Sequence, residues 1–160
     1  MSRSRIHPKS VLLAVLASTR EELWSAAALV PAEERASRRV CGEWTLKDVI
    51  GHVADWEWCF LKGLRQLTTP DAPGIEEAED IEAWNQAHAE ARRQQTWKTV
   101  WDDVHAARQA LLRCLDALSE ADLGRALPMP WRPTATAYDW FCVLAEHDRD
   151  HAKDLRREVR

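Results

Sequence analysis

Three histidines have the residue type and the spacing of a metal site. His147 and His151 stand four residues apart in an expected helix, and His52 lies on the apolar face of another. Side chains at positions i and i+4 of a helix share one face, with Cβ atoms about 5–6 Å apart, so two imidazoles there can hold one ion. A third imidazole from a second helix leaves coordination positions open, which is typical of a catalytic rather than a structural site.

The residues alone leave the identity of the ion open, because neutral imidazole suits zinc, nickel, iron or copper. The second nitrogen of a ligating ring usually needs a hydrogen-bond partner. Asp55 follows His52 by three residues and points to a similar side, so we expect its carboxylate to accept that hydrogen bond. Ordinary packing is the alternative, because an i, i+4 pair also arises by chance. The placement of all three histidines on core-facing stripes favours the metal.

Tryptophans are unusually frequent, with nine in the chain. Three of them, Trp56, Trp58 and Trp140, fall near the predicted site, and we expect Trp56 and Trp140 to line an apolar pocket beside it. Core packing is the alternative for each. The sequence has no glycine-rich phosphate loop, no G-x-S-x-G and no H-E-x-x-H, so the histidines are the motif that carries chemistry.

Apolar residues recur at helical spacing along most of the chain, which predicts an all-α protein. Four long helices are expected over residues 8–29, 46–67, 96–118 and 137–159. Residues 76–94 form a further helical piece, either separate from the one that follows or continuous with it. Four amphipathic helices make a four-helix bundle the simplest packing.

Capping-box sequences predict where helices begin. Thr45 and Thr136 are each followed three residues later by an aspartate, and Ser119 opens a short turn in the same way. Residues 31–44 are expected to be a polar connection without strands, and residues 125–133, which contain three prolines, to be irregular.

The composition describes a globular chain of 160 residues, which predicts a single domain over residues 1–160. Hydrophobic residues make up 46% and charged residues 30% of it. A net charge of −4 gives no electrostatic reason to expect nucleic acid, so no nucleic-acid partner is predicted. No apolar run approaches the roughly 20 residues that span a bilayer. The four cysteines form no C-x-x-C pair. We therefore predict a cytoplasmic protein without a membrane partner.

Two segments resemble the signatures of the DinB-like superfamily. They are WTLKDVIGHVADWE at residues 44–57 and EHDRDH at residues 146–151. Asn85 in the third helical region and the proline-rich loop before the last helix also fit. Members of this superfamily are four-helix bundles with up-down-down-up topology. Many hold a divalent metal through one histidine on the second helix and an H-x-x-x-H pair on the last, which here are His52, His147 and His151.

The resemblance also implies a range of activities. Some relatives are thiol-dependent transferases or isomerases that use mycothiol, bacillithiol or glutathione, and others are linked to detoxification or stress responses. We therefore expect a divalent ion, with zinc or nickel as the foremost candidates and iron or manganese as alternatives, and a low-molecular-weight thiol as a second cofactor.

Three functional hypotheses follow. The first is a metal-dependent thiol S-transferase or hydrolase that acts on a small electrophilic substrate. The second is a non-catalytic bundle that binds or sequesters an apolar small molecule. The third is a structural homodimer in which the histidines merely pack, and a homodimer is expected under the first two hypotheses as well.

Overall fold

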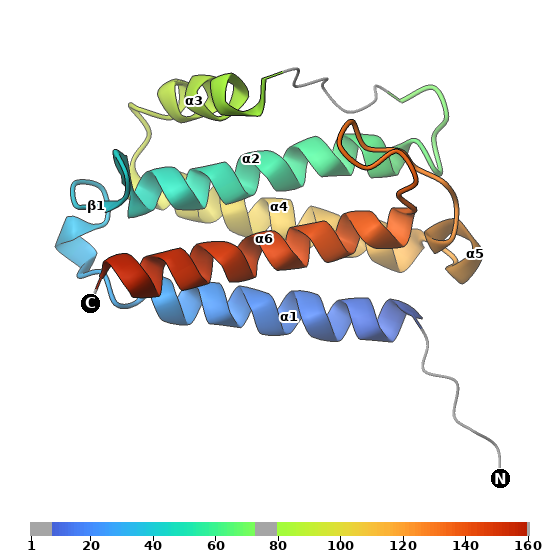
Figure 1. Cartoon of the computed structure of the whole chain (residues 1–160), viewed down its shortest axis with the longest axis horizontal. Coiled ribbons are helices and arrows are strands. Elements are labelled where there is room, and N and C mark those ends of the chain that lie inside the picture. Colours follow the sequence, from blue (N-terminus) through green and yellow to red (C-terminus); the bar gives the residue numbers. More distant parts are fainter. Residues whose placement is uncertain (1–7, 73–79, 160) are drawn as a thin grey trace, which may run out of the picture.

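Four long helices form the body of the protein. The computed structural model describes residues 8–72 and 80–159. The four helices are α1 (Pro8–Ala27), α2 (Leu46–Arg65), α4 (Trp97–Ala117) and α6 (Ala137–Glu158). In Figure 1, α1 and α6 run in one direction while α2 and α4 run in the other. The predicted all-α bundle with up-down-down-up topology is therefore confirmed.

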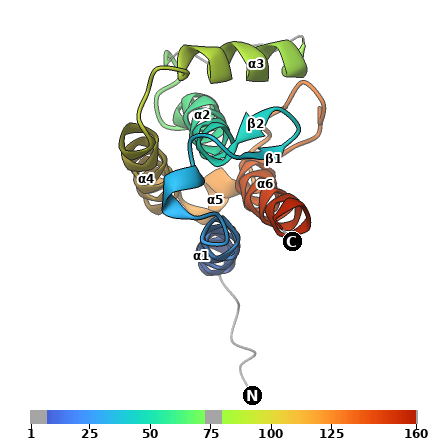
Figure 2. The ribbon, with the colours of Figure 1, turned by 90° about the vertical axis from the view of Figure 1, so that its left-hand side faces the viewer.

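The core consists of two clusters of buried apolar side chains, placed one after the other along the bundle. One contains Leu16 of α1 and Phe60 of α2, and the other contains Leu23 of α1 and Val53 of α2. Both clusters draw on all four long helices, so each helix buries apolar side chains against its neighbours at both ends of the bundle. Figure 2 views the four helices nearly end-on around this shared core.

Capping boxes begin the two helices that carry the histidines, as predicted. The Thr45 side chain accepts a hydrogen bond from the Asp48 backbone, and the Asp48 carboxylate accepts from the Thr45 backbone. Thr136 and Asp139 repeat this arrangement at the start of α6. Each box satisfies two backbone donors that a helix leaves unpaired and fixes where the helix starts. The third predicted box begins the short helix α5 (Glu120–Leu123).

A small β-hairpin between α1 and α2 was not predicted. A short 3₁₀ turn, η1 (Ala32–Glu34), precedes it, and strands β1 (Arg39–Cys41) and β2 (Trp44–Thr45) pair antiparallel. Gly42 turns the chain with a φ of 55°, which glycine adopts at little steric cost. The strands are too short to show the alternation that identifies a strand in sequence, so the expectation of a strandless connection was wrong here.

The predicted third helical region is broken into two separate helices. α3 (Ile81–Ala91) leaves the bundle and lies outside α2, as Figures 1 and 2 both show, while Thr96 caps the start of α4. Arg92 fastens this arrangement by donating to Asp55 of α2 at 2.7 Å and to Asp103 of α4 at 2.6 Å. Residues 76–79, with which the predicted helical piece over residues 76–94 begins, lie outside the described residues.

No helix in the described part of the chain is both long and apolar enough to cross a bilayer.

Candidate metal centre

The three predicted histidines converge on one point between α2 and α6. The Nε2 atom of His147 lies 2.9 Å from the Nε2 of His52 and 3.0 Å from the Nε2 of His151. One ligand atom from each of the three rings lies within 4.8 Å of the others. His147 and His151 reach the point together because α6 is helical and they are one turn apart, whereas His52 comes from the facing side of α2.

The chemistry of these nitrogens and the two short distances from His147 fit a bound cation. Zinc–nitrogen bonds of about 2.0–2.1 Å, meeting at about 90–110°, place two ligand nitrogens about 2.8–3.4 Å apart. The Nε2 of His147 faces two other Nε2 atoms, yet an imidazole nitrogen carries either one proton or one lone pair. It therefore cannot make a good hydrogen bond to both neighbours. A cation held between the three rings would use all three lone pairs.

Burial keeps the three rings in the neutral form that binds metals. Desolvation lowers the pKa of His52 to about 3, and the nearby His151 lowers it further. Burial also lowers the pKa of His147 well below its ordinary value, and that of His151. Since protons compete with metal ions for imidazole, rings that resist protonation are suited to holding an ion at neutral pH.

Asp55 makes no hydrogen bond to the three histidines, contrary to the prediction. Its carboxylate accepts hydrogen bonds from Arg92 and serves to hold α3 against the bundle. Among the described residues, the Nδ1 atoms of His52 and His151 are buried and have no hydrogen-bond partner. The sequence did not reveal this partner, because Arg92 lies 37 residues away from Asp55 along the chain.

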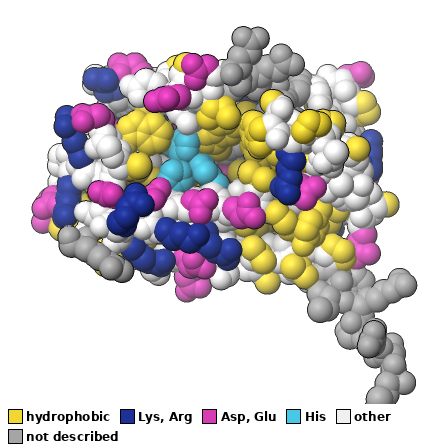
Figure 3. Space-filling model, in the orientation of Figure 1, with side chains coloured by type: hydrophobic (Ala, Val, Ile, Leu, Met, Phe, Trp, Pro, Cys, Tyr) yellow, Lys and Arg dark blue, Asp and Glu magenta, His cyan; other side chains and the backbone are white. Residues whose placement is uncertain are grey.

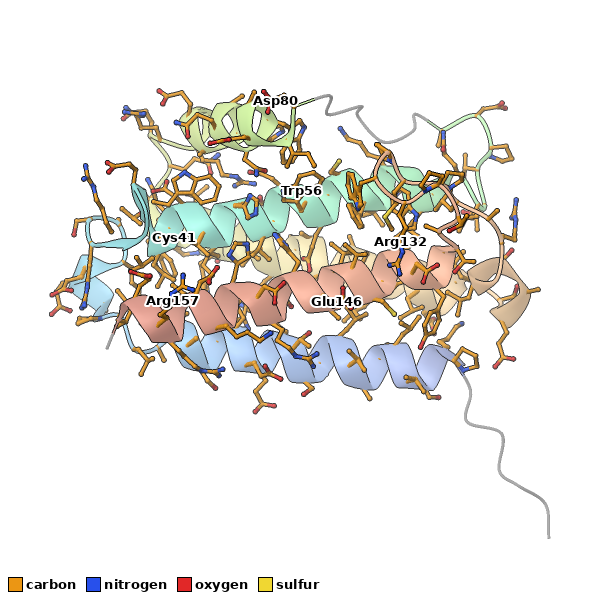
Figure 4. The ribbon with its side chains drawn as sticks, in the orientation of Figure 1. Cys41, Trp56, Asp80, Arg132, Glu146 and Arg157 are labelled. Atoms are coloured by element: carbon orange, nitrogen blue, oxygen red, sulfur yellow. The ribbon has the colours of Figure 1, made fainter. Side chains whose placement is uncertain are left out.

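A pocket of about 210 Å³ opens onto two of the three histidines, His52 and His147. Its lining consists of His52, Trp56, Phe60, Ile81, Asn85, Trp131, Val143, Leu144 and His147. In Figure 3, histidine side chains are visible in a hollow of this face, with hydrophobic side chains beside them. Figure 4 labels Trp56 on α2, on the side that α3 covers. The prediction that Trp56 lines an apolar wall agrees with this geometry.

The other two tryptophans point elsewhere. Trp140 is 1% exposed and packs against Phe60 in the core, where its indole donates to the Leu127 carbonyl at 2.6 Å. Its predicted place in the pocket wall is corrected, because α6 turns it towards the bundle interior. Trp58 donates to Asp103 on α4 and is likewise not part of the lining.

Comparison with known proteins agrees with the fold. The family model described as DinB superfamily matches residues 16–155. The chain belongs to the DinB superfamily. No curated protein matches it. An uncharacterised protein from Escherichia coli UTI89 has the same fold, with a TM-score of 0.77, 12% identity, and coverage of 96% of this chain and 93% of that one.

Two further solved structures resemble this DinB superfamily member closely in fold. A protein from Streptococcus pneumoniae has a TM-score of 0.76 at 15% identity, covering 98% of this chain and 92% of its own. The colibactin self-resistance protein ClbS, crystallised with a dsDNA, has a TM-score of 0.77 at 11% identity, covering 96% of each chain.

The ClbS complex overturns the exclusion of nucleic acid that was drawn from the charge balance. A protein with this fold has been crystallised with double-stranded DNA. The net charge was therefore no ground for excluding nucleic acid, and the prediction of no nucleic-acid partner was wrong. Net charge sums over the whole surface, whereas phosphate contacts depend on where individual Lys and Arg side chains lie.

A buried ionic quartet was missed from the sequence of this DinB superfamily chain. It consists of Arg20 (α1), Glu57 (α2), Arg108 (α4) and Asp148 (α6), one residue from each long helix. Their side chains are between 1% and 9% exposed. Although burial alone would lower it, the pKa of Arg20 is raised by the carboxylates of Glu57 and Asp148. On every helix the quartet residue falls between members of the two apolar clusters, so the quartet separates them.

The sequence contained a signal for the quartet. Each member interrupts an apolar helical stripe with a charge, as Arg20 does between Leu16 and Leu23, and the four charges sum to zero. The places of Asn85 and Trp131 in the pocket wall could not be read from the sequence. They reach the pocket from α3 and from the loop before α6, and nothing in their local sequence shows that these two segments meet.

Proposed function

We propose that this protein is a divalent-metal-dependent enzyme that joins a low-molecular-weight thiol, or water, to a small electrophile, in a detoxification or stress role. One observation carries the proposal. Three neutral imidazoles converge on one point, and two of them, His52 and His147, line a pocket of about 210 Å³. A structural metal site is normally closed by four protein ligands, whereas three ligands beside a pocket leave room for a reactant.

Each part of the site has a role in this proposal. His52, His147 and His151 would hold the ion. Bound there, a zinc or nickel ion would lower the pKa of a coordinated thiol or water. The aromatic walls formed by Trp56 and Phe60 would seat the electrophile beside the histidines and exclude bulk water. Among the described residues that line the pocket there is no carboxylate to act as a general base.

This lining favours a thiol over water as the nucleophile. A free thiol ionises near pH 8.5, while bulk water has a pKa of about 15.7, so a thiol needs less assistance from the site. In the reaction the thiol loses its proton to solvent, its sulfur bonds the electrophilic carbon, and the leaving group departs with the electron pair.

The test is an activity assay of untagged protein after chelation and after reloading with zinc or nickel. Glutathione and chlorodinitrobenzene serve as the thiol and the electrophile. Conjugation should require both metal and thiol, and His52→Asn should abolish it, while His105→Asn on α4 should retain it. Conjugation at the uncatalysed rate with every metal and thiol supplied would contradict the proposal.

Two other functions give different results in related measurements. A sequestering protein would bind small molecules equally well with and without chelator, and would show no turnover. Double-stranded DNA is a second candidate ligand because ClbS has been crystallised with it. Binding of a labelled duplex at two salt concentrations tests this, since phosphate contacts weaken steeply as salt rises.

A further inference from the structure

The pocket beside the histidines has no charged wall in the described part of the chain. Among its lining residues there is no Lys, Arg, Asp or Glu, and the polar groups are His52, His147, Asn85 and the two indole N–H groups. In the metal-free chain, a carboxylate or ammonium on a ligand would lose its hydration on entry and meet no opposite charge. Burying an unpaired ion costs far more than burying a neutral group. The side chains of the lining therefore select for a neutral molecule.

The shape and size of the pocket suit a flat ring. The Trp56 ring stands edge-on to Phe60 and to Trp131, with centroid distances of 6.0 Å in both cases and interplanar angles of 85° and 84°. These three rings form an aromatic corner where an inserted ring can both stack and make edge contacts. An apolar cavity of about 150 Å³ holds benzene, so about 210 Å³ accommodates one substituted ring.

Asn85 supplies a hydrogen-bond donor within this apolar lining. The Trp56 indole donates to Asn85 Oδ1 at 2.9 Å. An indole nitrogen can only donate, so this bond fixes which end of the amide faces Trp56 and leaves the NH₂ group turned away from it. Within residues 8–72 and 80–159, that NH₂ group has no hydrogen-bond acceptor. Asn85 thus has unused donors for a ligand, while one lone pair of its Oδ1 already accepts from Trp56.

We propose that the pocket binds a neutral, single-ring aromatic molecule that carries a hydrogen-bond acceptor such as a carbonyl or nitro group, with the Asn85 amide as its donor. This assignment rests on the proposed function in so far as the molecule is the electrophilic substrate. The ring lies in the corner of Trp56, Phe60 and Trp131. The acceptor points to Asn85, and the side nearest the triad faces His52 and His147.

The experiment compares three probes of similar size: acetophenone, ethylbenzene and benzoate. They differ in whether an acceptor is present and whether a charge is carried. Binding is measured on the full chain, metal-free and zinc-loaded, from the indole N–H signals of Trp56 and Trp131 in nitrogen-15 spectra. Phenylalanine substitutions assign these two signals among the nine tryptophans.

Acetophenone should shift both signals and bind about threefold to tenfold more tightly than ethylbenzene, which is the contribution of one neutral hydrogen bond. Benzoate should bind to the metal-free chain more weakly than either; on the zinc-loaded chain, where its carboxylate can reach the ion, only acetophenone and ethylbenzene are compared. Tighter binding of benzoate than of acetophenone by the metal-free chain, or no saturable shift with any aromatic probe, would overturn the assignment.

Asn85→Asp tests the donor directly. Aspartate keeps an acceptor for the Trp56 indole but has no NH₂ group, so the preference for acetophenone over ethylbenzene should disappear. Gln86→Glu is the matched control, because it makes the same chemical change at an exposed neighbour that lines a different groove. An unchanged preference in Asn85→Asp would remove Asn85 from the assignment.

Failure of this assignment can be distinguished from failure of the proposed function. Aromatic binding by a chain that takes up no metal would refute the enzyme while supporting the pocket's selectivity. Metal uptake and thiol conjugation with no preference for neutral aromatic probes would refute the assignment alone.

Discussion

Replacing Glu57 with glutamine should strongly destabilise the bundle, because it unbalances the buried quartet. Glu57 and Asp148 together neutralise Arg20 and Arg108 in a layer where no side chain is more than 9% exposed. The variant leaves two guanidinium groups sharing one carboxylate. Glu57 Oε1 accepts from Arg20 at 2.5 Å and from Arg108 Nε at 2.8 Å, so both arginines lose an anionic partner.

The magnitude follows from the cost of a buried unpaired charge. Breaking a buried ion pair by removing one partner costs about 3–5 kcal/mol. A direct estimate agrees, since two unit charges about 4 Å apart interact by about 4 kcal/mol at an effective dielectric constant of 20. This is a large share of the roughly 5–15 kcal/mol that stabilises a typical domain.

Urea unfolding of the metal-free protein, followed by circular dichroism, measures this loss. Glu90→Gln is the matched control, because Glu90 makes the same kind of ion pair with Arg93 at a side chain that is 57% exposed. It should change the free energy of unfolding by less than about 1 kcal/mol. The double variant Glu57→Gln/Arg108→Gln restores neutrality, so its loss in free energy of unfolding should be smaller than the sum of the losses in the two single variants. Equal losses in Glu57→Gln and Glu90→Gln would refute the reasoning.

Three further predictions concern acid stability, packing and the docking of α3. The metal-free fold should lose stability as the pH falls below about 6.5, because the folded-state pKa of His52 is about 3 and only the unfolded chain takes up the proton. The free energy of unfolding, obtained from urea titrations at several pH values, should fall by up to about 1.4 kcal/mol per pH unit for each such histidine. This pH dependence should be smaller in His52→Gln. Gly63→Ala should destabilise by about 1–3 kcal/mol in thermal melts, despite alanine's higher helix propensity, because the added Cβ would lie 2.6 Å from ring carbons of Trp140. Arg92→Leu should speed amide hydrogen exchange in α3 by roughly tenfold or more relative to Arg93→Leu, whose side chain is 65% exposed, while exchange in the bundle helices stays unchanged.

The sequence predicted the elements that depend on local pattern. Helical periodicity and the aspartates that follow Thr45 and Thr136 located α2 and α6, and the spacing of His147 and His151 followed from helical geometry. These features are set within one or two turns of chain, so they can be identified without knowledge of the packing.

Contacts between distant segments could not be predicted in this way. Asp55 was placed correctly on α2, but its partner Arg92 is 37 residues away in the turn after α3. The pocket wall depends on Trp131, which the proline-rich loop brings over Phe60 with a centroid distance of 6.3 Å. Such contacts depend on how α3 and that loop cross the bundle, and local periodicity carries no information about it.

The central claim, that His52, His147 and His151 share one ion, is tested most directly by metal analysis of untagged protein with inductively coupled plasma mass spectrometry. We predict one divalent ion per chain in the unaltered protein and in His105→Ala, and less than a tenth of that in His147→Ala when circular dichroism shows the fold to be retained. An unchanged metal content in folded His147→Ala, or no metal in the unaltered protein after growth with zinc and nickel, would contradict the account.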